Sequence, residues 1–151
     1  MADLARRAQL SQAANTRYLE ALSAVDADTP LAQVLDQVCR PVFVGERRFR
    51  GLRPFDADEV RLLETVSRGE FEIAGFRNQD LRLALFSQSE DSAERRRQAA
   101  RVTRLLALLR AHGLIKKIPR THRYLLTAAG RPAIAALLAA RRVTLHQLTA
   151  A

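Results

Sequence analysis

The side chains in this sequence that are best suited to chemistry are basic, and a dense group of them lies between residues 92 and 123. An arginine can read guanine in the DNA major groove through two parallel hydrogen bonds, and a small alanine permits close approach or meets a thymine methyl group. Five residues are therefore candidates for base contacts: Arg96, Arg97, Ala100, Arg101 and Arg104. Seven more are candidates for contacts with phosphates or the adjacent minor groove: Asn78, Ser92, Lys116, Lys117, Arg120, His122 and Arg123. For each residue taken singly, an ordinary solvated surface group is the alternative.

The distribution of charge favours a polyanionic partner. The chain has a formal net charge of +9, from 25 Lys and Arg against 16 Asp and Glu. Residues 95–151 hold 13 of the basic residues and no Asp or Glu, whereas residues 1–94 hold all 16 acidic ones. A merely solvated surface usually mixes both signs, so nucleic acid is favoured over a solubilising arginine-rich surface.

Support for catalysis or metal binding is weak. Asp56, Asp58 and Glu59 stand at an expected helix start, where carboxylates complement the helix dipole. The three histidines and the single cysteine lack metal-ligand spacing: His112, His122, His146 and Cys39. We expect no enzyme activity, no cofactor and no metal. A half-buried structural role for Cys39 is favoured over a redox-sensing one.

The cysteine content and the hydrophobic segments indicate in which cellular compartment the protein is expected. A single cysteine excludes an internal disulfide and fits a reducing environment. Residues 1–10 lack the apolar segment of a signal peptide, and the longest apolar run, residues 133–140, is too short to span a bilayer. The sequence therefore predicts a cytoplasmic protein with no membrane association.

A long helix followed by a hairpin must position the basic residues. Around Val102, leucines at +3, +4 and +7 form a core-facing stripe, and Arg97, Ala100 and Arg104 fall on the opposite side of the helix. Gly113 supplies the left-handed residue that ends a helix. Two short runs, 114–118 and 123–127, then flank a turn at residues 119–122, which predicts a β-hairpin with a basic tip.

The elements around this pair follow from caps and periodicity. Asp56, with Glu59 three residues on, predicts a capping box and a helix to about residue 66. Residues 70–73 alternate polar and apolar, which predicts a short strand that pairs with the later hairpin. Asn78 is the expected N-cap of a helix over 79–86, residues 87–92 form a turn, and Asp91 or Ser92 caps the long helix. Thr127 is the expected N-cap of a final helix over 128–142, followed by a tail over 143–151.

The first 55 residues read as an appendage. Residues 1–40 form a helical pair, one helix over 3–25 and a second that starts at Thr29-Pro30, and the first could pack against its twin in a homodimer. Residues 41–55 hold a hairpin with a two-residue turn at Gly45-Glu46. Four arginines follow that turn: Arg47, Arg48, Arg50 and Arg53. An exposed edge kept soluble by charge is favoured for them over a secondary phosphate contact.

Two stretches carry a resemblance to a known family. Residues 108–117, LLRAHGLIKK, and residues 121–130, THRYLLTAAG, are similar to the passage from recognition helix into wing and to the return strand of winged helix-turn-helix regulators. Residues 56–142 therefore resemble the winged helix-turn-helix superfamily, MarR- and ArsR-like bacterial regulators among them. The chain also looks like the C-terminal part of longer uncharacterised bacterial proteins.

The resemblance implies a mostly α fold with a small β-sheet, preceded by an N-terminal helical pair and a short hairpin. It also implies binding of double-stranded DNA, as in a homodimeric transcriptional regulator. Two alternatives stay open: a winged-helix protein-interaction module, and a DNA-positioning domain of a mobile-element or replication protein. RNA binding is disfavoured because the exposed aromatic residues that stack on single strands are scarce.

Overall fold

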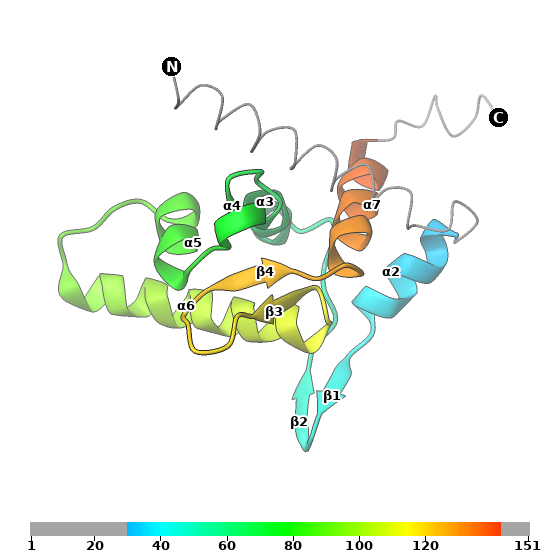
Figure 1. Cartoon of the computed structure of the whole chain (residues 1–151), viewed down its shortest axis with the longest axis horizontal. Coiled ribbons are helices and arrows are strands. Elements are labelled where there is room, and N and C mark those ends of the chain that lie inside the picture. Colours follow the sequence, from blue (N-terminus) through cyan, green and yellow to red (C-terminus); the bar gives the residue numbers. More distant parts are fainter. Residues whose placement is uncertain (1–29, 143–151) are drawn as a thin grey trace.

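The structure is a computed structural model that describes residues 30–142 (Figure 1). The expected helix over 3–25, its dimer contact, Thr29 and the tail over 143–151 lie outside the described residues. The described part is mostly helical, with two small antiparallel hairpins. Its elements are α2 (Leu31–Cys39), β1 (Val42–Val44), β2 (Arg47–Phe49), α3 (Ala57–Val66), α4 (Phe71–Ala74), α5 (Asn78–Leu85), α6 (Ser92–Ala111), β3 (Ile115–Lys117), β4 (Tyr124–Leu126) and α7 (Gly130–Arg142).

The hydrophobic core gathers around the C-terminal two thirds of α6. Val102 and Leu109 are fully buried there, as the predicted stripe requires, while Leu105 is only half-buried. Helices α3, α5 and α7 supply the facing side chains, among them Leu62, Leu63, Leu81, Ile134 and Leu137. Since each fully buried apolar side chain contributes about 1.5–3 kcal/mol, this packing fixes where α6 lies and which of its faces remains outside.

Helix α6 begins and ends as its sequence predicts. The Asp91 carboxylate accepts a hydrogen bond from the Ala93 amide at 3.0 Å, which makes Asp91 the N-cap. At the other end Gly113 adopts φ 70°, and the Leu114 amide donates to the Leu109 carbonyl at 3.0 Å. This bond closes a Schellman-type C-terminus and turns the chain directly into β3.

The β3–β4 hairpin also forms where it was predicted. Ile115 pairs with Leu126 and Lys117 with Tyr124. At its tip the Thr121 amide donates to the Ile118 carbonyl at 3.2 Å, and Arg120 has φ 60°. A proline in second position and a positive φ in third is the pattern of a type II turn. The β1–β2 hairpin is confirmed as well, with Val44 paired to Arg47 around a two-residue turn.

The prediction of a strand over 70–73 is wrong. Residues 71–74 form the short helix α4, and the β-type pairing with the hairpin is a single bridge further along, between Phe76 and Tyr124. Phe71 packs edge-on against Phe76 with ring centroids 5.6 Å apart, while Ile73 remains 45% exposed. A strand would have placed Phe71 and Ile73 on one buried face. Four alternating residues are too few to separate a strand from one helical turn.

Three predicted caps also need correction. Asn78 is the first residue of α5, and the N-cap is Arg77, whose amide donates to the Asp80 carboxylate at 2.7 Å. Asp56 caps α3, but Glu59 does not complete a capping box, because its carboxylate accepts from the Arg53 amide at 2.6 Å instead. Pro30 is the N-cap of α2 rather than its first residue.

The final helix starts later than predicted, although its predicted cap is confirmed. The Thr127 hydroxyl accepts from the Gly130 amide at 2.8 Å, and α7 begins at Gly130 rather than at residue 128.

Candidate nucleic-acid interface

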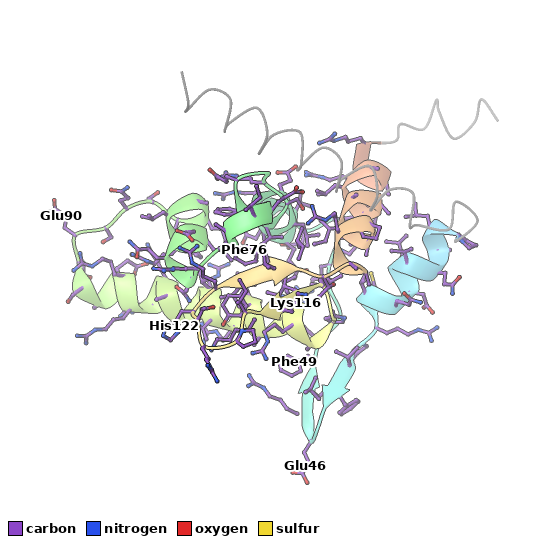
Figure 2. The ribbon with its side chains drawn as sticks, viewed as in Figure 1. Glu46, Phe49, Phe76, Glu90, Lys116 and His122 are labelled. Atoms are coloured by element: carbon purple, nitrogen blue, oxygen red, sulfur yellow. The ribbon has the colours of Figure 1, made fainter. Side chains whose placement is uncertain are left out.

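The N-terminal half of α6 is held by α5 through polar contacts. The Asn78 side-chain amide donates to the Ala99 carbonyl and to the Thr103 hydroxyl, both at 2.9 Å. The connection between the two helices is tied back by Gln98, whose side chain donates to the Ser87 carbonyl at 3.2 Å. Figure 2 shows Glu90 in this connection, at the far end of the molecule from α7. These bonds set the angle at which α6 projects.

The outer face of α6 carries the predicted base-reading residues. All five are exposed: Arg96, Arg97, Ala100, Arg101 and Arg104. Three of them, Arg97, Ala100 and Arg104, lie on the side of the helix opposite the buried Val102, while Arg96 lies on the flank toward α5. Arg97 has only a distant ion pair with Glu94, at 3.8 Å, and its side chain is 78% exposed. Because an exposed pair of this length contributes little, the guanidinium of Arg97 is available to a ligand.

Arg101 is separated from the other four. It points to the flank of α6 that faces α3, where it pairs with the Asp58 carboxylate at 3.1 Å. Its guanidinium also lies over the Phe86 ring, 5.4 Å from the centroid. The structure thus gives Arg101 an intramolecular role that helical spacing alone did not reveal.

The phosphate candidates on the β3–β4 hairpin divide into free and tethered groups. Lys116, Lys117, Arg120 and His122 are exposed, and Figure 2 shows His122 at the turn. Since successive residues of a strand point to opposite faces, the two lysines present charge on both sides of β3. Arg123 is half-buried and donates to the Ala74 carbonyl at 3.0 Å, so it braces the hairpin against α4.

The two remaining phosphate candidates lie at the starts of neighbouring helices, Asn78 in α5 and Ser92 in α6. Ser92 is exposed, while the amide of Asn78 is committed to α6 as described above. They border a shallow groove of about 520 Å³ between α5 and α6. Arg82 and Arg95 also line it, and neither was among the predicted residues. Arg82 lies one helical turn after Asn78 in the sequence, which was the available signal.

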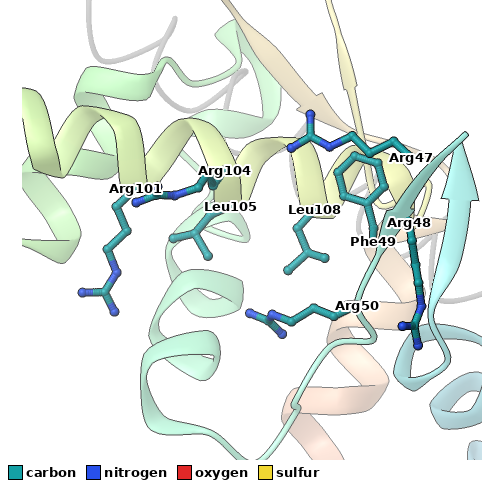
Figure 3. Close-up of a pocket in the computed structure, with 8 residues that line it drawn as sticks. All are labelled: Arg47, Arg48, Phe49, Arg50, Arg101, Arg104, Leu105 and Leu108. Atoms are coloured by element: carbon teal, nitrogen blue, oxygen red, sulfur yellow. The ribbon is translucent and has the colours of Figure 1, made fainter.

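A second group of arginines that the prediction set aside lies beside the C-terminal half of α6. Arg47 and Arg50 extend from the β1–β2 hairpin toward Arg101 and Arg104 (Figure 3). The hairpin was interpreted as a charged edge, because no local pattern showed what it packs against. Its neighbour α6 is more than 50 residues away in the sequence.

Cys39 and the histidines form no joint site. Within residues 30–142, no three His, Cys, Asp or Glu side chains cluster as metal ligands would. Cys39 is exposed, so the expected half-buried thiol is wrong. Partial burial and the carboxylates of Glu59 and Asp36 raise the pKa of the Cys39 thiol. Such a shift lowers the thiolate fraction, which is the reverse of what activates a redox-sensing cysteine.

His112 acts as a connector at the end of α6. Its Nε2 donates to the Arg50 carbonyl at 2.8 Å, so the end of α6 is joined to the segment that follows β2.

None of the helices in residues 30–142 is long and apolar enough to cross a membrane. Comparison of the whole chain with family models, curated proteins and solved structures gave no match.

Proposed function

We propose that the protein binds double-stranded DNA as a winged helix-turn-helix, with α6 as recognition helix and β3–β4 as wing, and acts as a transcriptional regulator. The observation that carries this proposal is the exposed face of Arg96, Arg97, Ala100 and Arg104 on α6, which continues through Gly113 into a hairpin bearing Lys116 and Lys117. The core holds α6 by its opposite face, so these groups are presented without rearrangement.

The dimensions of α6 suit a major groove. Its 20 residues span about 30 Å, and a helix with side chains fits the major groove of B-DNA. With its N-terminal half in the groove, Arg97 and Ala100 approach base edges, as recognition helices do. The hairpin then lies against the sugar–phosphate backbone, where Lys116, Lys117, Arg120 and His122 contact phosphates.

The electrostatics also favour a duplex. Residues 95–142 hold 13 Lys and Arg and no acid, and most of the described acidic residues lie on α2, α3 and α4 or beside them. A surface with positive charge on one side attracts a polyanion and orients it toward that side. Neutralised phosphates release counterions, so binding to DNA must weaken steeply as salt rises.

A salt titration tests the proposal. Fluorescence anisotropy with a labelled duplex of mixed sequence should show binding at low salt, with a slope of log K against log salt of roughly −4 to −7 for five to eight phosphate contacts. Arg40→Gln, directly after α2 and outside the proposed interface, is the charge-matched control and should leave the slope unchanged. Absence of duplex binding at low salt would contradict the proposal and favour a protein-interaction module.

A further inference from the structure

A groove separates the β1–β2 hairpin from the C-terminal half of α6, and its volume is about 390 Å³. Figure 3 shows Arg47 and Arg50 extending from the hairpin toward α6, while the neighbouring Arg48 points away from it. Leu105 and Leu108 of α6 form the apolar floor. The groove thus has cationic rims over an apolar floor.

The hairpin is held firmly in this position. At its base the Leu52 amide donates to the Val38 carbonyl at 2.8 Å, and the Leu52 side chain is only 3% exposed. His112 joins the end of α6 to the Arg50 carbonyl at 2.8 Å. Phe49 is half-buried against the core. The groove is therefore a preformed feature of the fold, bounded by two anchored elements.

The cations around the groove are only partly compensated. Arg50 pairs with the buried carboxylate of Glu59 at 2.5 Å, and Arg101 pairs with Asp58 at 3.1 Å. Within residues 30–142, Arg47 and Arg104 contact no carboxylate. Arg47 instead lies over the Phe49 ring, 4.8 Å from its centroid, and this stacking holds its guanidinium at the rim. Both of these uncompensated side chains line the groove, Arg47 from the hairpin and Arg104 from α6.

We propose that β1–β2 is a second DNA-binding wing, whose Arg47 binds a phosphate of the duplex backbone on a different flank of α6 from β3–β4. This inference rests on the proposed function, since α6 must first lie in the major groove. Arg104 belongs both to the outer face of α6 and to the groove, so a backbone strand that passes beside α6 reaches the groove directly. Guanidinium groups are the donors best shaped for phosphate oxygens.

The test compares two neighbouring arginines of one hairpin. Arg47→Gln removes the charge at the groove, whereas Arg48→Gln removes the same charge from a side chain that points away. For Arg47→Gln, the fall in affinity for duplex DNA between 50 and 200 mM salt should be about threefold smaller than for the wild type, as loss of one phosphate contact requires. For Arg48→Gln it should match the wild type. Both side chains are exposed, so equal melting temperatures will verify that folding is unchanged.

Hydroxyl-radical footprinting on the same duplex locates the contact. The wild type and Arg48→Gln should protect a backbone segment on each flank of the groove that holds α6, and Arg47→Gln should lose one of the two. If Arg47→Gln and Arg48→Gln both behave as the wild type while the wild type binds duplex DNA, the second wing is wrong and the proposed function stands. If the wild type binds no duplex DNA, both the proposed function and the second wing are wrong.

A third arm separates a duplex phosphate from a free anion. Isothermal titration with pyrophosphate, without DNA, should detect no binding that depends on Arg47. A different result would overturn the second wing: pyrophosphate binds, Arg47→Gln abolishes that binding, and the DNA footprint of Arg47→Gln equals that of the wild type. The groove would then serve a small anionic ligand.

Discussion

Individual arginines of α6 differ in what they contact, and this difference separates their expected roles. Arg97 and Arg104 face outward with no close carboxylate within residues 30–142, whereas Arg101 is bound to Asp58. The helical wheel predicted the outward face but not the exception, because Asp58 lies 43 residues earlier and only packing brings it near. Residue type therefore identified the candidate set, and tertiary contacts divide it.

This division predicts how two pairs of substitutions behave. Arg97→Ala with Arg104→Ala should reduce discrimination between a preferred duplex and a random one by about tenfold or more, since each bidentate base contact contributes about 1–3 kcal/mol. Lys116→Ala with Lys117→Ala should weaken binding to all duplexes alike and make the salt slope less negative by roughly 1–2. Competition binding with both duplexes measures each effect. Identical behaviour of the two pairs would show that base readers and phosphate contacts are not separated in this way.

A buried ion pair makes Glu72 and Arg131 critical for stability. Their side chains are 8% and 16% exposed and form an ion pair, and the second carboxylate oxygen of Glu72 has no hydrogen-bond partner. Arg131→Met leaves a buried unpaired carboxylate, so the free energy of unfolding should fall by about 3–5 kcal/mol. Adding Glu72→Leu should restore most of it. Urea denaturation checks both values, and a loss below about 1 kcal/mol for Arg131→Met would mean that the pair is solvated.

The thiol of Cys39 gives a prediction about pH. Its pKa is raised, first by burial and then by the charges of Glu59 and Asp36, so the folded protein has less thiolate at a given pH than the unfolded chain. Alkylation by iodoacetamide at pH 8 should therefore be slower for the folded protein than for the protein in urea. As pH rises through the raised pKa, the small stability that the neutral thiol contributes is lost. Faster alkylation of the folded protein would contradict this environment.

At the scale of elements, local signals sufficed where an end of a helix or a turn is specified by its own residues. Asp91, Gly113 and Thr127 each close hydrogen bonds within four or five residues, and all three capping residues were predicted. The failures at Asn78 and at residues 70–73 have different causes. The Asn78 side chain bonds to the distant Ala99 and Thr103 instead of capping α5, whereas the alternation over 70–73 is too short to separate a strand from one helical turn.

The junction between β3 and α7 depends on one glycine. A Cβ at Gly130 would lie 2.0 Å from the Leu114 carbonyl oxygen, so α7 can approach the β3–β4 hairpin only with no side chain there. Gly130→Ala should force the two apart and lower the free energy of unfolding by about 1–3 kcal/mol, as overpacking does.

Gly69→Ala is the matched control for Gly130→Ala, since a Cβ at Gly69 would meet nothing within 4 Å. This control should change stability by less than about 0.5 kcal/mol. Thermal denaturation of both variants compares them. Equal melting temperatures would show that the β3–α7 junction relaxes without cost.

At the scale of the whole molecule, the charge asymmetry along the chain becomes an asymmetry in space. The β3–β4 hairpin and the hairpin bearing Arg47 both lie beside α6, whose outer face carries arginines. The sequence assigned α6, β3–β4 and Asn78 to a site, but not the hairpin bearing Arg47. The groove at Arg47 could not be predicted, because it exists only where β2 and α6 pack. Composition indicated the kind of partner, and the arrangement of elements indicates the surface that meets it.

The central claim is that α6 and its flanking hairpins contact duplex DNA, and backbone amide chemical shifts during a titration with duplex DNA test it most directly. We predict that the largest shifts fall in residues 92–104 and 116–123, with a smaller set at 47–50, while α3 and α7 change little. Shifts concentrated on α3 or α7, or no shifts at all with excess duplex at low salt, would contradict the account.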